Sequence, residues 1–200
     1  MEAARKIAAE KASYQPVADR DRAPVGAQKT RVAKWPVFAF RPMSQFRERS
    51  DMLSWGRVDR PRQFVAEPAS RADLEGLLLE GAGMFGQGLL GRGLGRSYGD
   101  TNLHRDGGLI AMSGIDRILA FDDWTGLLKA EAGISLAKII EFALPRGFFL
   151  PVTPGTKYVT LAGAIANDVH GKNHHRAGTF GCCVEEIGLL RTDMTTRRLT

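Results

Sequence analysis

Residues 86–100 read GQGLLGRGLGRSYGD and contain six glycines. Glycine loses more conformational freedom on folding than any other residue, so this density indicates a functional need. The usual need is the close approach of backbone N–H groups to a phosphate or another anion. The stretch therefore predicts a loop that binds a phosphate-bearing ligand.

Two common nucleotide-binding motifs can be tested against this stretch. Residues 86–91 satisfy G-x-G-x-x-G, but that fingerprint requires a strand before it and a helix after it. Here a leucine-rich segment with helical spacing precedes the fingerprint and further glycines follow, and the G-K-[ST] of a P-loop is absent. We therefore place the binding segment downstream, at residues 91–101, where Arg92 and Arg96 add positive charge and Ser97 adds a hydroxyl donor. The alternative is a purely structural glycine-rich turn.

Two later segments also suggest a ligand. Residues 154–168 read PGTKYVTLAGAIAND and place small side chains at the start of a helix expected near Thr160, which is a typical anion site. HGKNHH, at 170–175, follows directly. There His170 is a candidate donor and Lys172 a candidate contact for an anion or substrate; the alternative is a polar surface loop. No carboxylate lies at a matching spacing, so we expect no metal site. His104 is expected to be exposed.

From residue 63 onward the pattern is α+β. Strands are predicted at Gln63–Ala66, at about Gly108–Met112, within 116–122 and 126–132, and as a hairpin within 183–191 and 197–200. Ser70 and Asp73 mark the start of a helix that runs to about Gly83. A second, amphipathic helix is predicted within 134–147, with Leu136, Ile139, Ile140 and Ala143 on one face.

The positive charge is concentrated at the N-terminus. The chain has 200 residues and a net charge of +6, of which residues 1–62 contribute +7 and residues 63–200 contribute −1. A basic arm can contact nucleic acid or an anionic membrane surface, but neither an aromatic platform nor a recognition helix accompanies it. We therefore expect a solvated tail and no nucleic-acid partner. Residues 1–51 are predicted to be a basic, largely disordered extension, and residues 52–200 the folded domain.

Composition and cysteine content narrow the expected location. No apolar run approaches the roughly 20 residues of a membrane span, and the N-terminus lacks the apolar core of a secretory signal. Cys182 and Cys183 are adjacent, which makes no disulfide framework and fits a reducing compartment. We expect two small buried side chains there and a cytoplasmic protein, with peripheral membrane association as a further option.

Three segments together carry a family resemblance. GRGLGRSYGD (91–100), LPVTPGT (150–156) and TLAGAIANDVHGKNHHRAGTFG (160–181) closely resemble the FAD-binding domain of the vanillyl-alcohol oxidase/p-cresol methylhydroxylase type, over about residues 52–200. The resemblance implies a split α+β fold that holds FAD between two subdomains. The chain would contain the first subdomain and the start of the second.

The resemblance also assigns residues by position. The loop that holds the FAD pyrophosphate corresponds to Gly91, Arg92, Gly93, Leu94, Gly95, Arg96, Ser97, Tyr98, Gly99, Asp100 and Thr101. A second FAD contact corresponds to Gly155, Thr160, Leu161, Ala162 and Gly163, where Ala162 replaces a usual glycine. His170 corresponds to a residue at the flavin, and Tyr98 and Lys172 to residues on the substrate side. No residue is assigned a certain catalytic role. Residues 92–98 contain no histidine, so the FAD is expected to be non-covalent.

The activity implied by the resemblance is oxidation of a sugar hydroxyl to a ketone, with hydride transfer to the flavin. The branch most like this chain acts on a polyprenyl-phosphate sugar and works with a short-chain reductase partner. One alternative is a sugar-lactone (aldonolactone) oxidase of the same fold. Because the family continues for more than twice this length, the chain is expected to be an N-terminal FAD-binding fragment. A further alternative is an inactive truncated or split-gene product.

Overall fold

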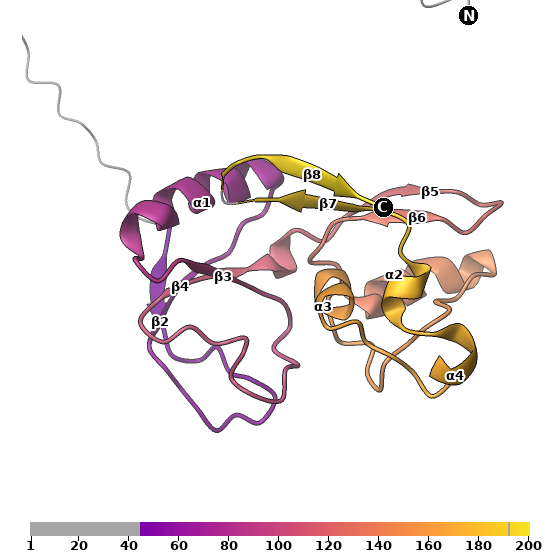
Figure 1. Cartoon of the computed structure of the whole chain (residues 1–200), viewed down its shortest axis with the longest axis horizontal. Coiled ribbons are helices and arrows are strands. Elements are labelled where there is room, and N and C mark those ends of the chain that lie inside the picture. The colour runs from indigo at the N-terminus through magenta and orange to yellow at the C-terminus, as the bar shows by residue number, and fades with distance from the viewer. Residues whose placement is uncertain (1–44, 192) are drawn as a thin grey trace, which may run out of the picture. The chain divides into compact units, whose positions relative to one another are not determined.

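The computed structural model describes residues 45–191 and 193–200 (Figure 1). Most of the predicted N-terminal extension lies outside the described residues. Its last part does not behave as an extension, however, because Arg47–Arg49 form strand β1 and Phe46 is buried. Residues 46–49 therefore pack with the folded domain, and the prediction of a largely disordered extension concerns residues that lie mostly outside the described part. The apolar ring of Phe46 explains this, since burying it favours docking of the adjoining strand.

The first half of the described chain forms a four-stranded sheet in the order β1-β2-β4-β3. Strand β1 pairs antiparallel with β2 (Gln63–Ala66), whereas β2 and β3 (Leu89–Arg92) both pair parallel with β4 (Gly108–Ala111). Strands β2 and β3 run parallel on either side of β4, and helix α1 (Arg71–Met84) connects them, because parallel strands require long connections. Ser70 caps α1, because its Oγ accepts a hydrogen bond from Asp73 N at 3.1 Å.

Helix α1 packs on this sheet through a small apolar core. Leu77 is completely buried and clusters with Phe46, Ala66 and Ile110. The rings of Phe46 and Phe85 meet edge to face with their centroids 5.0 Å apart. This core holds β3 in place, and therefore also positions the start of the glycine loop.

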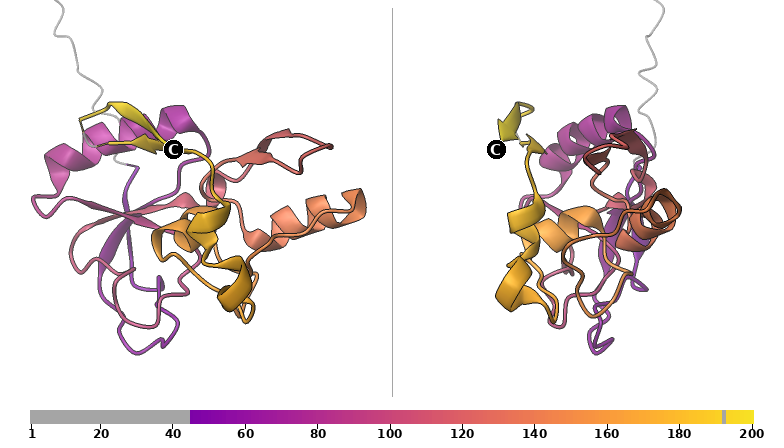
Figure 2. Two further views of the ribbon diagram at one scale, coloured as in Figure 1. Left: turned by 45° about the vertical axis from the view of Figure 1, so that its right-hand side comes forward. Right: turned by 90° about the vertical axis from the view of Figure 1, so that its right-hand side faces the viewer.

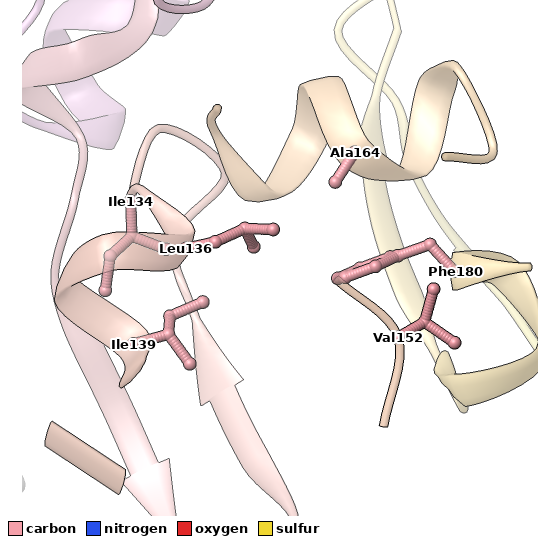
Figure 3. Packing of buried hydrophobic residues seen from close by; sticks show 6 residues of the cluster. All are labelled: Ile134, Leu136, Ile139, Val152, Ala164 and Phe180. Atoms are coloured by element: carbon pink, nitrogen blue, oxygen red, sulfur yellow. The ribbon is translucent and has the colours of Figure 1, made fainter. Parts of the chain in front are cut away.

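The second half contains a hairpin and three helices. Strands β5 (Ile118–Phe121) and β6 (Leu128–Ala130) pair antiparallel, and α2 (Leu136–Ala143), α3 (Leu161–Ala166) and α4 (His174–Ala177) follow. The short 3₁₀ helices lie at Met112–Gly114, Leu144–Arg146 and Phe180–Cys183. Figure 3 shows the core of this half, which is built from Ile134, Leu136, Ile139, Val152, Ala164 and Phe180.

The last two strands form a separate hairpin, with β7 (Ile187–Leu190) antiparallel to β8 (Thr196–Leu199). It lies beside α1 in Figure 1 and in the left view of Figure 2. The Arg71 guanidinium at the start of α1 donates to Thr196 Oγ1 at 2.9 Å. The end of the chain thus contacts an element that begins about 125 residues earlier in sequence.

Three local features differ from the expectations. Strand β3 was expected to be part of the glycine loop. Cys182 and Cys183 are exposed rather than buried, because only Phe180 of their 3₁₀ helix faces the core. His104 is half-buried rather than exposed, and its Nδ1 lies 3.1 Å from the Gly108 carbonyl oxygen.

Candidate functional site

The glycine loop begins where β3 ends at Arg92. None of the backbone N–H groups of residues 94–102 donates a hydrogen bond to another described residue. Gly95 is buried in the left-handed region, at φ +67°, which glycine adopts without a steric penalty. Only Gly95 and Asn102 among these residues are buried, where backbone donors are almost always satisfied; the free N–H groups of the segment are therefore available to a ligand that supplies acceptors. Free backbone donors are what an anion-binding loop requires, and the assignment of residues 91–101 to a phosphate stays a prediction.

Arg92 points inward rather than towards solvent. Its side chain is buried, and its guanidinium donates to the Leu53 carbonyl oxygen at 2.5 Å and approaches Met52 Sδ at 3.4 Å. Burial is the largest influence on its pKa, which it lowers. Arg92 therefore joins the loop to residues 52–54. The segment following Met52 forms part of the site, which the sequence analysis did not recognise.

The glycine loop meets the second small-residue segment directly. Gly93 lies against Thr160, and a Cβ on Gly93 would overlap the Thr160 hydroxyl and approach its Cγ2 to 3.2 Å. Thr160 is itself buried. The tertiary structure therefore brings together two residues that are 67 positions apart in the sequence.

The start of α3 is not a free anion site. Leu161 N donates to Ile134 O at 2.7 Å, Ala162 N to Ala132 O at 2.9 Å, and Gly163 N to Thr160 Oγ1 at 3.1 Å. These N–H groups already have protein acceptors, so the segment cannot offer them to phosphate. Its small side chains instead leave room for the glycine loop to approach.

The HGKNHH segment is held against the loop that contains Gly155. Asn173 Nδ2 donates to the Pro151 carbonyl oxygen at 3.0 Å, and the His170 backbone forms a bridge with Thr179. The His170 and His174 rings meet edge to face at 5.4 Å. Gly155 lines a neighbouring pocket of about 340 Å³ with Leu136, Ile140 and Phe149.

The substrate-side candidates Tyr98 and Lys172 are both exposed. Within the described part of the chain, no hydrogen bond or ring contact joins them. No group of three or more His, Cys, Asp or Glu residues in the same part is arranged to hold a metal ion. No helix in that part is long and apolar enough to cross a membrane.

Residues 62–200 match the model of a family described as the FAD binding domain. The chain belongs to this FAD-binding domain family. It is 41% identical over 152 residues to the decaprenylphosphoryl-beta-D-ribose oxidase of Mycolicibacterium smegmatis, a match that covers 74% of this chain and 32% of that protein. It is 29% identical over 90 residues to the D-lactate dehydrogenase of Anaerostipes hadrus, which covers 45% of this chain and 18% of the relative.

Solved structures confirm the fold of this FAD-binding domain. The BBE-like 1 protein of Physcomitrella patens superposes with a TM-score of 0.66 at 20% identity, covering 77% of this chain and 35% of that chain. An alkyldihydroxyacetonephosphate synthase superposes with a TM-score of 0.61 at 18% identity, covering 72% and 30%. The α+β fold expected from the resemblance is confirmed. The chain spans about a third of the length of these proteins.

The described residues fit FAD. Besides the free N–H groups of the loop, the buried side-chain amide of Asn102 has no partner at either polar atom among the described residues. Leaving such a group unpaired costs about 1–3 kcal/mol, and a dinucleotide offers both acceptors and donors. Asn102 directly follows the loop and was not selected from the sequence. An asparagine in a sequence does not by itself indicate a binding residue, and only the burial of Asn102 in the structure distinguishes it from a surface asparagine.

Proposed function

We propose that this FAD-binding domain belongs to an oxidoreductase that oxidises a hydroxyl of a polyprenyl-phosphate sugar to a ketone. The observation that carries the proposal is the 41% identity to the decaprenylphosphoryl-beta-D-ribose oxidase over 152 residues. The ketone product would require a reductase partner to complete an epimerisation. Because the hydrocarbon tail of this substrate resides in a bilayer, the enzyme would act at the membrane surface.

In this proposal, the residues of the chain hold and orient the two reactants. The free N–H groups of residues 94–102 bind the cofactor pyrophosphate. Thr160 supports the loop through its contact with Gly93. His170 lies at the flavin, while Lys172 and Tyr98 contact the substrate. When bound, FAD supplies the acceptor for the hydride that leaves the sugar carbon.

We propose that FAD is bound without a covalent link. Residues 92–98 contain no histidine, and His104, the nearest one in sequence, has its Nδ1 3.1 Å from the Gly108 carbonyl oxygen. Denaturation in acid should therefore release all of the flavin into the supernatant. Flavin that remains with the precipitated protein would contradict this assignment.

A second candidate is oxidation of a D-2-hydroxy acid. The 29% identity to the D-lactate dehydrogenase favours it, although that match covers less of the chain. A sugar-lactone oxidase of the same fold is a third candidate. All three reactions remove a hydride from a carbon that bears oxygen. Their chemistry is therefore the same, and only the identity of the substrate can distinguish them.

Anaerobic reduction of bound flavin tests the proposal. The chain is loaded with FAD and mixed separately with a short polyprenyl-phosphoryl ribose, an aldonolactone and D-lactate. We expect only the first to bleach the flavin absorbance, and Lys172→Met to slow this bleaching without changing FAD occupancy. Bleaching by the lactone or by D-lactate alone would replace the proposed substrate, and a failure to retain FAD would contradict the assigned site.

A further inference from the structure

A second pocket lies between residues 51–57 and the side chains of the glycine loop. Its volume is about 210 Å³, and its lining includes Asp51, Ser54, Trp55, Arg57, Arg92 and Arg96. Trp55 N donates to Ser97 O at 3.0 Å, and Arg92 donates to Leu53 O at 2.5 Å, so the two walls are hydrogen-bonded to each other. The pocket is a defined feature of the fold rather than a gap between unconnected segments.

The pocket is strongly positive. Three guanidinium groups line it, and its one carboxylate, Asp51, is already held by Arg49 at 2.7 and 2.8 Å. Neither Arg57 nor Arg96 forms an ion pair with a carboxylate in residues 45–191 or 193–200. Two cations in the lining therefore have no neutralising partner.

A buried donor in the lining also lacks a partner. Arg92 is 8% exposed, and its Nε has no hydrogen-bond acceptor among the described residues. An unsatisfied charged donor at this depth is rare in native proteins. An anion in the pocket would pair with the Arg57 and Arg96 guanidinium groups that line it.

One wall of the pocket carries an exposed indole, that of Trp55. Trp55 is 55% exposed, and Val58 and Tyr98, which adjoin the two walls in sequence, are 91% and 86% exposed. The Arg96 guanidinium lies over the Trp55 ring, 5.5 Å from its centroid. Cations beside the exposed Trp55 ring match a phosphate that carries a hydrocarbon substituent better than a free inorganic ion.

We propose that this pocket binds the phosphate group of the polyprenyl-phosphate substrate, separately from the FAD pyrophosphate. The inference rests on the proposed function. The glycine loop would then serve two ligands, with its backbone N–H groups on the cofactor and its Arg92 and Arg96 side chains on the substrate. Arg57, which belongs to no assigned cofactor contact, is the residue that separates the two roles.

Binding of geranyl phosphate tests this inference without requiring turnover. The chain has three tryptophans, so Trp35→Phe and Trp124→Phe leave Trp55 as the only indole, and its fluorescence reports the pocket. We expect geranyl phosphate to change this fluorescence at lower concentration than inorganic phosphate does, and geraniol to have no effect. Arg57→Ala should weaken geranyl phosphate binding about tenfold or more and leave FAD occupancy unchanged.

The matched control is Arg105→Ala, which removes an exposed arginine that pairs with Asp59 at 2.8 Å outside the pocket. It should leave the geranyl phosphate affinity unchanged. Thermal unfolding of each variant shows whether it is folded, and Arg57→Lys provides a second test that retains the charge and should recover part of the affinity.

Titration of the FAD-loaded chain distinguishes the two phosphate sources. Equal geranyl phosphate affinity with and without FAD supports a separate substrate site. Mutual exclusion of FAD and geranyl phosphate would overturn the inference, because the pocket would then belong to the cofactor. Absence of geranyl phosphate binding, or an Arg57→Ala variant that binds it normally, would overturn it too. If binding holds but the flavin is not bleached, the proposed oxidation fails and the phosphate pocket remains.

Discussion

At the scale of single residues, the site depends on close backbone approach and on buried polar groups. Gly93 touches Thr160, and Gly95 adopts a left-handed conformation beside the Arg92 guanidinium and the Leu53 carbonyl. Arg92 Nε and the Asn102 amide are buried and unpaired in the described part of the chain. Each unpaired buried polar group lowers the stability of the fold by about 1–3 kcal/mol, and a ligand that supplies the missing partners would offset this cost.

Gly93→Ala tests the close approach. The new Cβ would overlap the Thr160 hydroxyl, so we expect a loss of about 1–3 kcal/mol in the free energy of unfolding and weaker FAD binding. Gly91→Ala is the matched control in the same segment, because its Cβ would meet nothing within 4 Å. Urea denaturation measures both, and equal stability of the two variants would refute the contact.

At the scale of elements, capping hydrogen bonds and strand pairing determine where helices and strands begin. Ser70, Ser135 and Thr160 each accept a hydrogen bond from the third residue of the helix that follows. Ser70 marked the start of α1 in the sequence, whereas α2 was predicted from its apolar spacing and α3 from its small residues after Thr160. Strand β3 was missed because Leu89–Arg92 contains a glycine and adjoins others, and its pairing with β4 outweighs that unfavourable local propensity.

Thr160 joins the cap of α3 to the glycine loop. Thr160→Val keeps the side-chain shape but removes the oxygen that accepts from Gly163 N, so we expect a loss of about 1 kcal/mol in unfolding free energy. Thr160→Ser keeps that oxygen and should lose less of the capping contribution. Chemical denaturation of the two variants compares them, and a more stable Val variant would show that the cap contributes little.

The β5–β6 hairpin should show a specific acid response. Glu131 accepts hydrogen bonds from the Arg117 guanidinium and backbone, and these lower the pKa of its carboxyl group despite partial desolvation. A folded-state pKa below the unfolded value of about 4.3 adds stability that is fully present above that pH. This contribution is lost as the pH falls through the folded-state pKa.

Glu131→Gln removes this titration. Between pH 6 and about pH 3, the unfolding free energy of the wild type should therefore fall more steeply than that of the variant. Glu141→Gln provides a control at an exposed glutamate for which no ion pair occurs among the described residues. Identical pH profiles for the wild type and Glu131→Gln would show that the Arg117 contact has no thermodynamic effect.

At the scale of the whole described domain, the Gly93–Thr160 contact joins the half that contains the four-stranded sheet to the half that contains α2 and α3. One core lies between α1 and the four-stranded sheet, and the other lies among α2, α3 and the loops around Val152 and Phe180. Gly133 N donates to Ile115 O at 2.8 Å, and the Gly93–Thr160 contact provides a further connection. Weakening either core should therefore loosen the cofactor site.

Leu136→Ala tests this coupling. Leu136 is fully buried in the second core, so its truncation should cost about 2–5 kcal/mol of unfolding free energy and lower FAD affinity even though it lies outside the glycine loop. Leu144→Ala is the control, since Leu144 is 59% exposed and its truncation should change stability by less than about 0.5 kcal/mol. FAD titration and thermal unfolding report the two effects.

The sequence by itself determined most of the elements and indicated a phosphate-bearing ligand. Helix caps, apolar spacing and glycine density are local signals, and they were sufficient to locate three helices, most strands and the segment whose N–H groups are free. The FAD-binding family was recognised separately, from the resemblance of three motif segments at 91–100, 150–156 and 160–181. His104 and the two cysteines were misjudged because burial depends on neighbours that local sequence does not reveal.

Only the tertiary structure decided how the site is built. It turned Arg92 inward, brought residues 52–57 against the glycine loop, placed Gly93 on Thr160 and buried the amide of Asn102. It also showed that the start of α3 donates its N–H groups to protein oxygens rather than to phosphate. The physical reason is that each of these properties depends on contacts between segments distant in sequence, whereas sequence patterns report the preferences of near neighbours.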